Sequence, residues 1–366
     1  MCTNFKAPIA EDGTVVVGRG LDYPALMGFQ ICVIPRDLER TALADPESPG
    51  GKAWTTQHGV VGISVAGVEA VILDGMNTAG LSAHLLYMVG GFFHPAEYRG
   101  DGSDVSQIEL ACYLLTTCAS VAEVREVLPQ INVWGWRAGL PFTPPVHVAV
   151  YDREESVVLE FRPEGLVIVD NPTGVVTNSP YLDWHLTNLN NYVGMTAHNP
   201  DRQRLRPRVG AMDDRAIGLS DYLPDLAQRL RPRVGGMDIR ALGVGWGLRG
   251  LPGDFTGPSR FVRAVMFNSL AATPKDSREA EMLTLHILNT FDVPAGVVEE
   301  PGPGGVEVDE VTYADTICNL SDLRYSYRAL DDPTVYVIDL KETDFTGGAS
   351  RFRDISARGD FTPVSI

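Results

Sequence analysis

The chain has 366 residues, of which 44% are hydrophobic and 21% are charged, so a sizeable packed core is expected and general disorder is not. Its formal net charge of −17 disfavours nucleic acid and anionic membrane surfaces as partners, because both attract clustered cations. The sequence contains no apolar run of about 18 residues to span a membrane, and no basic segment leading into an apolar one to mark a signal peptide.

The chain begins Met1-Cys2-Thr3, and removal of the initiator methionine is expected to make Cys2 the first residue. A free amino-terminal cysteine carries a thiol and an α-amine on one residue, and such an amine has an ordinary pKa of about 7.7–8.0. The amine can take the proton of the thiol, directly or through a water, so that one residue supplies both nucleophile and base. Many chains begin Met-Cys by chance, so this start gains meaning only from the rest of the sequence.

Five cysteines are scattered along the chain, and none lies in a C-x-x-C spacing, so the sequence predicts no zinc site and no cofactor. Cys112 and Cys118 fall inside an apolar helical pattern and Cys32 inside a strand-like run, so all three are expected to be buried small hydrophobic residues. A papain-like protease built on Cys112 or Cys118 is therefore disfavoured. This cysteine usage fits a reducing, cytoplasmic location.

Runs rich in β-branched residues predict strands along most of the chain. The first residues join this set, which would hold the amino terminus inside a sheet. The later runs are short and separated by turn residues, as in an antiparallel meander. The expected strands cover residues 3–5, 13–19, 30–35, 59–65, 69–73, 146–151, 157–161, 166–169, 313–320, 323–330 and 335–340.

Apolar residues at helical spacing predict helices between these groups of strands. The expected helices cover residues 104–127, the region near 184–186, a segment starting at 259, and residues 279–289. Ser120 is a candidate helix cap, and the composition of residues 20–24 and 74–77 is typical of turns. Strands at both ends of the chain with helices between them suggest an α+β fold of two antiparallel sheets packed face to face, with helices outside.

An internal repeat interrupts this pattern, because Arg204–Asp213 recurs with one change at Arg229–Asp238. Two copies are too few for a solenoid, which needs at least about three units. We therefore expect a single domain over residues 1–366 with a duplicated, arginine-rich insertion at about 201–242. A solvated loop is the favoured interpretation of this basic segment, and an anion-binding patch is the alternative.

Several short stretches lie in order over nearly the whole chain and resemble the choloylglycine hydrolase and penicillin V acylase family of N-terminal nucleophile hydrolases. The similarity departs at the duplicated segment and in the loop around Gly302. The matching stretches are Met1-Cys2-Thr3, Gly18-Arg19-Gly20-Leu21-Asp22, Asp74-Gly75-Met76-Asn77, Val176-Thr177-Asn178-Ser179-Pro180, Gly250-Leu251-Pro252-Gly253-Asp254, Ser259-Arg260-Phe261-Val262-Arg263 and Pro294-Ala295-Gly296.

The resemblance implies a four-layer αββα sandwich of two antiparallel sheets, commonly assembled as a homotetramer, that hydrolyses linear, non-peptide amide bonds of small molecules. By position, Cys2 is the nucleophile through Sγ, and its α-amine is the base. A cation at Arg19 near Sγ would favour the thiolate. Asp22 would hydrogen-bond the α-amine and hold it in place.

The same resemblance makes Asn178 the side-chain donor to the tetrahedral oxyanion, a contribution on the order of 2.7–4 kcal/mol for comparable donors. The second donor is expected from the backbone N–H of Tyr87, and Arg260 would hold the polar network around the nucleophile. The competing structural interpretations are a plain Arg19–Asp22 ion pair and Asn178 as a turn former. The chemistry needs none of the histidines, which we expect to be packed or exposed: His84, His147, His185 and His286.

The substrate class depends on few residues. At the position of Tyr87, bile salt hydrolases of this family tend to carry Asn, whereas penicillin V acylases tend to carry Tyr. Residues 181–185 also resemble the acylases more than the bile salt hydrolases. An aromatic side chain there suits a flat phenoxyacetyl group or an acyl chain. Removal of such an acyl group is the first hypothesis, conjugated bile salts are the second, and N-acyl homoserine lactones are the third. A protein of a different class, which binds bile acids or acyl chains without turnover, is the remaining alternative.

Overall fold

The structure is a computed structural model that describes residues 1–24, 28–45, 50–65, 70–88, 90–137, 139–140, 142–197, 233–234, 237–238, 247–301 and 307–355. The chain separates into two compact units, Met1–Leu189 with Gly253–Ile366, and Asn190–Pro252. All the candidate site residues belong to the larger unit. The expectation of a single domain over 1–366 stays a prediction.

The duplicated segment belongs to the smaller unit. Within it, β15 (Arg233–Val234) pairs antiparallel with β16 (Met237–Asp238). The remainder of the duplicated segment lies outside the described residues, and so does the loop around Gly302. The interpretations of the repeat as a solvated loop or an anion-binding patch stay predictions.

The first sheet of the larger unit is 7-stranded and has the order β14-β1-β2-β18-β19-β20, with β17 paired to β18. All of these strands pair antiparallel. Phe5 on β1 and Val17 on β2 are fully buried, as expected for two central strands. The strands are β1 (Cys2–Lys6), β2 (Val16–Pro24), β14 (Val175–Val176), β17 (Glu299–Pro301), β18 (Glu307–Asn319), β19 (Arg324–Ala329) and β20 (Asp332–Asp339).

The second sheet is 8-stranded and has the order β13-β12-β11-β8-β7-β6-β3-β21. Its strands also pair antiparallel. They are β3 (Phe29–Ile34), β6 (Val60–Val65), β7 (Ile72–Asn77), β8 (Ser82–Tyr87), β11 (Val146–Tyr151), β12 (Ser156–Arg162), β13 (Gly165–Asp170) and β21 (Arg351–Asp354). The meander predicted over residues 146–169 is therefore confirmed.

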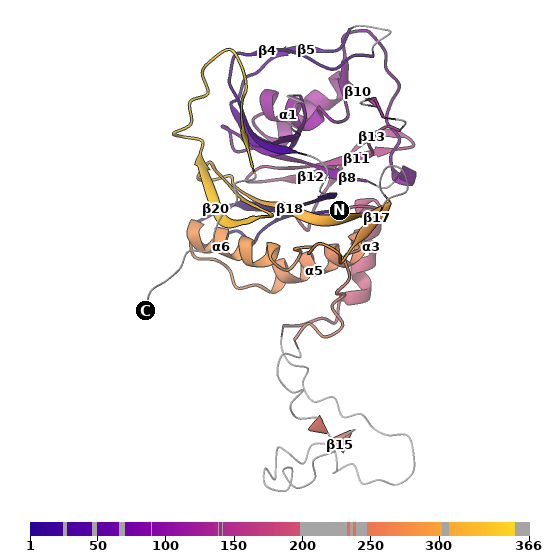
Figure 1. Cartoon of the computed structure of the whole chain (residues 1–366), viewed down its shortest axis with the longest axis vertical. Coiled ribbons are helices and arrows are strands. Elements are labelled where there is room, and N and C mark those ends of the chain that lie inside the picture. The colour runs from indigo at the N-terminus through magenta and orange to yellow at the C-terminus, as the bar shows by residue number, and fades with distance from the viewer. Residues whose placement is uncertain are drawn as a thin grey trace. The chain divides into compact units, whose positions relative to one another are not determined.

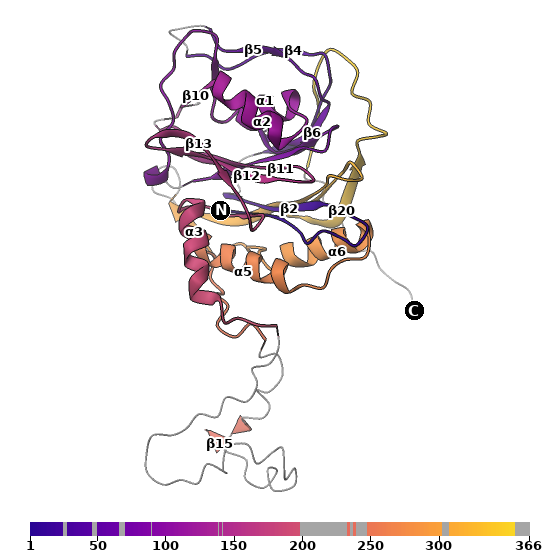
Figure 2. The same cartoon turned by 180° about the vertical axis from the view of Figure 1, so that it is seen from behind.

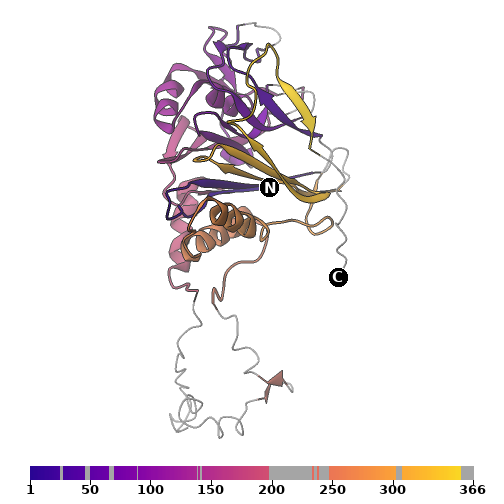
Figure 3. The same cartoon turned by 90° about the vertical axis from the view of Figure 1, so that its left-hand side faces the viewer.

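Helices cover the outer face of each sheet, as the views in Figures 1 and 2 show. α5 (Gly257–Leu270) and α6 (Ser277–Leu288) pack against β1, β2, β14 and β18. α1 (Leu110–Thr117) packs against β7 and β8, and α2 (Val121–Val127) follows it. The side view in Figure 3 shows the two sheets lying between these helices. The predicted four-layer αββα sandwich is confirmed.

Local sequence explains where these helices begin. The side chain of Ser120 accepts a hydrogen bond from the backbone N–H of Glu123, so the predicted cap is present at the start of α2. Thr256 caps α5 and Asp276 caps α6 in the same way. The remaining short elements are β4 (Glu39–Thr41), β5 (Ala53–Thr55), β9 (Asp104–Ser106), β10 (Asn132–Trp134) and α3 (Leu182–Asn188). None of the helices in the described ranges is long and apolar enough to cross a membrane.

Two predicted turns are wrong, because pairing between distant strands overrides the turn composition. Residues 20–24 continue β2, which is held between β1 and β18. Residues 74–77 belong to β7, in which Gly75 lies directly opposite Gly62 of β6. A Cβ atom on Gly62 would lie 2.2 Å from the carbonyl oxygen of Asp74. These glycines therefore allow two backbones to approach closely, and they do not form a turn.

The helix predicted over residues 104–127 is correct only in part. Residues 104–106 form β9, which pairs parallel with β10, and the helical part is divided into α1 and α2. The buried carboxylate of Asp104 accepts hydrogen bonds from the backbone N–H groups of Arg99 and Gly100 and from the side chain of Asn132. These contacts hold the segment in an extended conformation before α1 begins.

Candidate active site

The two central strands of the first sheet bring Cys2 and Arg19 together. Cys2 lies opposite Leu21, and Asn4 lies opposite Arg19, so the side chains of Cys2 and Arg19 project from the same face of the sheet. Asp22, three residues further along β2, projects from the other face. All three candidate residues are almost fully buried, with relative exposures of 3% for Cys2 and 1% each for Arg19 and Asp22.

The guanidinium group of Arg19 lies against the sulfur of Cys2. Its Nη2 donates to Cys2 Sγ at 3.4 Å and to the carbonyl oxygen of Leu85 at 2.6 Å, and its Nη1 donates to the carbonyl oxygen of Leu73. Burial lowers the pKa of Arg19, but the charges of Cys2 and Asp74 outweigh burial and raise it. A permanent cation in this position stabilises negative charge on the sulfur. No ion pair joins Arg19 to Asp22 among the described residues, where Arg19 pairs with Asp74 instead, so the competing interpretation of a plain Arg19–Asp22 pair is not supported.

Asp74 supports Arg19 from behind. Its Oδ2 lies 3.7 Å from Nη1 of Arg19 and 2.6 Å from Nδ1 of His84, and its Oδ1 accepts a hydrogen bond from the hydroxyl of Tyr325 at 2.6 Å. Burial raises the pKa of this carboxyl group, but His84 and then Arg19 and Tyr325 lower it below its ordinary value. Asp74 is therefore an ionised partner that balances the buried charge of Arg19. Residues 74–77 were predicted as a turn and His84 as a packed or exposed residue, so this support was missed.

Asn178 connects the start of the chain to the second sheet. Its side-chain Oδ1 accepts from the backbone nitrogen of Cys2 at 3.0 Å, and its Nδ2 donates to the carbonyl oxygen of Tyr87 at 2.6 Å. Because an amide NH₂ group has two protons, one N–H remains for another acceptor. Asn178 is thus held through its side chain beside the candidate nucleophile, and it is more than a turn former.

Arg260 reaches the same residues from the helix layer. It is fully buried on α5 and donates to the carbonyl oxygen of Cys2, to Thr3 Oγ1 and to Asn178 Oδ1. Its Nε donates to the carbonyl oxygen of Phe255 at 2.8 Å. Burial lowers the pKa of Arg260, against the opposing charges of Asp22 and Cys2. Arg19 and Arg260 therefore hold Cys2 from opposite faces of one strand.

The backbone of Tyr87 faces this group of residues. Tyr87 is the last residue of β8 and lies opposite Val146 of β11. The adjacent residue, Met88, donates its N–H to Pro145 on the β11 side. Since backbone groups alternate in direction along an antiparallel pair, the N–H of Tyr87 points away from β11, on the side where its carbonyl meets Asn178. The ring of Tyr87 is 46% exposed.

Two histidines hold the loop that carries Asn178. Nε2 of His185 lies 2.9 Å from the carbonyl oxygen of Asn178, and Nε2 of His147 lies 3.1 Å from that of Thr177. Burial lowers the pKa of His147 to about 4 and also lowers that of His185. Neutral imidazoles that donate to these carbonyls fix the loop in place. Both histidines are packed, as expected, but the sequence alone did not indicate this supporting contact.

The amino terminus is described with Met1 in place. Met1 donates its terminal nitrogen to the carbonyl oxygen of Asp22 at 3.2 Å. Oδ1 of Asp22 accepts from the hydroxyl of Thr312 at 2.7 Å, and its Oδ2 has no hydrogen-bond partner within the described part of the chain. The nitrogen of Cys2 is here an amide, so a contact between Asp22 and a free α-amine stays a prediction.

This four-layer sandwich, with a buried cysteine at the start of a central strand, has the Ntn-hydrolase fold. The family model for linear amide C–N hydrolases of the choloylglycine hydrolase family matches residues 2–218 and 225–355. The chain belongs to this family, and it is therefore an amidohydrolase that acts on linear amide bonds.

Relatives and solved structures agree with this assignment. The bile salt hydrolase/transferase of Clostridium perfringens is 28% identical over 359 residues, which cover 95% of this chain and 94% of that protein. The bile salt hydrolase/transferase of Lactiplantibacillus plantarum is 29% identical over 331 residues, or 88% of each chain. A mutant of the conjugated bile acid hydrolase from Clostridium perfringens superposes with a TM-score of 0.76 at 25% identity over 100% of both chains. Penicillin V acylase from Agrobacterium tumefaciens gives 0.69 at 25% identity over 98% of this chain and 92% of that one.

The buried His147 predicts an acid-dependent loss of stability. Its pKa is lowered to about 4 in the folded chain, whereas an unfolded histidine titrates near ~6.5. The unfolded chain therefore binds the proton first, and the stability that the neutral imidazole contributes is lost as the pH falls from about 6.5 towards 4. The loss should be on the order of 3 kcal/mol in the free energy of unfolding.

Urea denaturation at a series of pH values measures this effect. In the His147→Gln variant, which keeps a donor for Thr177, the free energy of unfolding should no longer fall by this amount, on the order of 3 kcal/mol, between pH 6.5 and 4. The exposed His286→Gln variant is the matched control and should behave like the unmodified chain. If the pH dependence of His147→Gln equals that of the unmodified chain, the imidazole of His147 takes up its proton as readily in the folded chain as in the unfolded chain, and the prediction is wrong.

Proposed function

We propose that Cys2, freed by removal of Met1, is the nucleophile that cleaves the amide bond, and that its own α-amine is the base. The contact between Cys2 Sγ and Arg19 Nη2 at 3.4 Å is the observation that carries this proposal. The nitrogen of the same residue lies 3.0 Å from Asn178. One residue held between a guanidinium and an amide thus offers both groups that acyl transfer needs.

The reaction follows from this arrangement. The α-amine takes the thiol proton, and the sulfur attacks the amide carbonyl carbon, so that negative charge develops on the carbonyl oxygen. The second N–H of Asn178 and the N–H of Tyr87 stabilise that oxygen. The C–N bond breaks as the ammonium returns its proton to the leaving amine, which leaves a thioester on Cys2. A water, deprotonated by the same amine, then hydrolyses the thioester and releases the acid.

The supporting residues have distinct roles in this scheme. Arg19, with Asp74 behind it, stabilises the thiolate. Asp22 carries a carboxylate oxygen that has no hydrogen-bond partner among the described residues, and this oxygen becomes a partner for the α-amine once that amine is free. Arg260 fixes the carbonyl oxygen of Cys2 and the side chain of Asn178 relative to each other. Together these contacts hold the nucleophile, the base and the oxyanion donor in one geometry.

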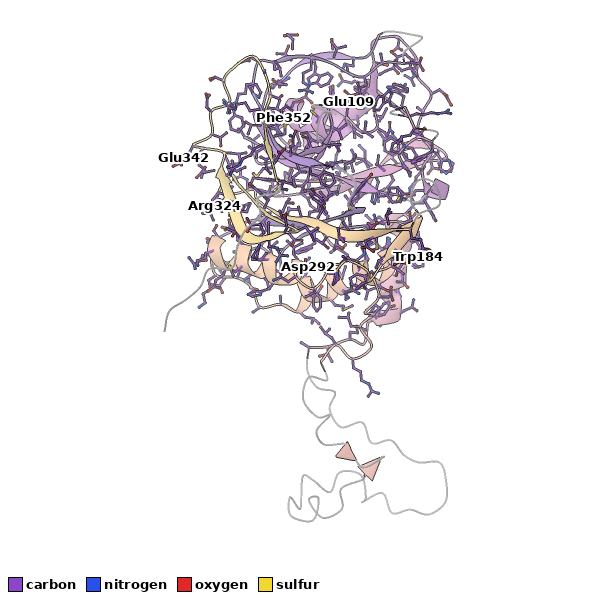
Figure 4. All side chains as sticks on the ribbon, viewed as in Figure 1. Glu109, Trp184, Asp292, Arg324, Glu342 and Phe352 are labelled. Carbon is purple, nitrogen blue, oxygen red and sulfur yellow. The ribbon has the colours of Figure 1, made fainter. Side chains whose placement is uncertain are left out.

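For the acyl half of the substrate we propose a flat aromatic group of the phenoxyacetyl type, as in penicillin V. The half-exposed ring of Tyr87 lies on the residue whose N–H would meet the oxyanion, so an aromatic acyl group can pack against it. Trp184, labelled in Figure 4, lies on α3 after the Asn178 loop and is a second aromatic residue with 45% of its area exposed. The likeness to the penicillin V acylase of Agrobacterium tumefaciens supports this choice.

Conjugated bile salts are the second candidate, because the curated relatives quoted above carry the name bile salt hydrolase/transferase. N-acyl homoserine lactones are the third. A protein that binds such molecules without turnover remains the alternative of a different class. The packing of Arg19, Asn178 and Arg260 around Cys2 supports an enzyme, since a pure binding protein has no need to hold a nucleophile among these donors.

A turnover panel distinguishes these possibilities. Purified protein should hydrolyse at least one of penicillin V, glycine- or taurine-conjugated bile salts and acyl homoserine lactones, with the phenoxyacetyl group released fastest. Cys2→Ala should abolish all turnover and keep the thermal unfolding transition, and so should an uncleavable extension that removes the free α-amine. Full activity of either variant, or Met1 retained in the mass spectrum of an active protein, would contradict the mechanism.

Asn178 provides a test of the oxyanion contact. Asn178→Ala should lower kcat by about 10²–10³-fold, as for other oxyanion donors, because the donor acts on charge that exists only in the transition state. Steady-state kinetics on the best substrate of the panel measure this, with exposed Asn289→Ala as the control. A change confined to KM would instead assign Asn178 to substrate binding.

A further inference from the structure

A buried carboxylate outside the proposed catalytic group lies at the amino terminus. Glu310 on β18 is 4% exposed, and its Oε1 forms an ion pair with the ammonium group of Met1. Apart from this ion pair, Oε1 has no hydrogen-bond partner within the described residues. Removal of Met1 therefore leaves a buried, unpartnered carboxylate oxygen beside the nucleophile, and such a group requires a compensating partner.

A second carboxylate shares this face of the sheet. Glu300 on β17 lies opposite Val308 on β18, and Val308 is two residues from Glu310, so the side chains of Glu300 and Glu310 project from the same face. Glu299 lies opposite Asp309 and projects from the other face. Burial lowers the pKa of the Met1 ammonium, and Glu300 is among the anions that oppose this effect.

Glu300 also acts on the opposite side of the site. Burial and then the charge of Glu300 raise the pKa of the Tyr87 hydroxyl. Glu300 is thus among the charges that act on both the amino terminus and the side chain of Tyr87. Arg260 is a cation in the same field, but its donors are already used by Cys2, Thr3 and other oxygen acceptors.

Met1 marks the side of the site where the amine half of a substrate must lie. In the proposed reaction the leaving amine receives its proton from the nitrogen of Cys2, so it lies next to that nitrogen. Met1 is bonded to the same nitrogen, and its ammonium group meets Glu310. The space that Met1 occupies is therefore on the leaving-group side, where Glu310 contacts it, and Glu300 projects from the same face of the sheet as Glu310.

We propose that Glu310 and Glu300 are specificity-determining residues that select amides whose amine half carries no negative charge. Neutral amino alcohols and cationic diamines are the chemical classes that fit, because the carboxylates repel an anion and attract a cation. The inference rests on the proposed function of Cys2, since it uses the position of the leaving amine. Penicillin V and the bile salt conjugates both carry an anion on the amine half, so each should be cleaved more slowly than a neutral amide of the same acid.

Three amides of one acid test the proposal. Phenoxyacetyl amides of glycine, ethanolamine and ethylenediamine have the same acyl group and short amine halves that are anionic, neutral and cationic. If the panel above favours another acyl group, that group replaces phenoxyacetyl. We expect kcat/KM for the neutral and cationic amides to exceed that of the glycine amide by ~10-fold or more at low ionic strength. Equal or faster hydrolysis of the glycine amide would overturn the proposal.

Variants locate the effect. Glu310→Gln and Glu300→Gln should each raise kcat/KM for the glycine amide several-fold and leave the neutral amide nearly unchanged. Glu299→Gln, which removes the same charge from the opposite face of the strand, is the matched control and should keep the original ratio. If all three variants shift the ratio equally, only the overall negative charge of the chain matters, and the assignment to Glu310 and Glu300 is wrong.

Binding to the Cys2→Ala variant separates this proposal from the catalytic one. Calorimetric titration of the three amides should give the same order of affinity, with the glycine amide weakest. If the unmodified chain hydrolyses the amides but they do not follow this order, the selectivity proposal is wrong and the nucleophile proposal stands. If the amides bind in this order but the unmodified chain does not hydrolyse them, the nucleophile proposal is wrong and the selectivity proposal stands.

Discussion

The site depends on the burial of two guanidinium groups around one residue. A buried arginine is tolerated only if its charge is balanced and its N–H groups find acceptors. Arg19 meets this requirement at its two terminal nitrogens, with two strand carbonyls, the sulfur of Cys2 and the carboxylate of Asp74, while its Nε has no hydrogen-bond partner among the described residues. Arg260 meets it with oxygen atoms of Cys2, Thr3, Asn178 and Phe255. Since Cys2 is a partner of both, satisfying the two arginines also fixes the start of the chain.

The four layers of the fold supply these partners from separate elements. Arg19 projects toward the second sheet and donates to backbone carbonyl oxygens of β7 and β8. Arg260 comes from α5, on the outer side of the first sheet. Asn178 arrives on the loop after β14 and is held by two buried histidines. Most of these contacts join residues far apart in the chain, so the geometry at Cys2 exists only when both sheets and the helix layer are assembled.

These long-range contacts also explain how far the sequence alone could lead. The strands over residues 146–169 and 313–340 and the α+β class were predictable, because their local patterns agree with the final fold. The turns at 20–24 and 74–77 were wrong, since pairing with neighbouring strands holds both segments extended, and Gly75 serves the close approach of β7 to β6. The candidate residues came from a family resemblance, because no spacing joins Cys2 to Arg260. The roles of Asp74, His185 and Glu310 depend on which side chains face each other, and a single sequence does not show this.

The carboxylates around Cys2 differ in the partners that they contact. Asp74 is ionised, and its carboxylate oxygens are occupied by contacts with Arg19, His84 and Tyr325. Its charge is therefore balanced within the protein. Asp22 and Glu310 each have a buried oxygen without a hydrogen-bond partner in the described chain, and both lie at the amino terminus, where the proposed mechanism places the free α-amine and the leaving half of a substrate. In the proposed mechanism Asp74 stabilises Arg19, the cation beside the sulfur of Cys2, whereas Asp22 and Glu310 leave a negative field on the amine side. On the two proposals together, the acyl half and the amine half of a substrate are met by different chemistry, aromatic on one side and anionic on the other.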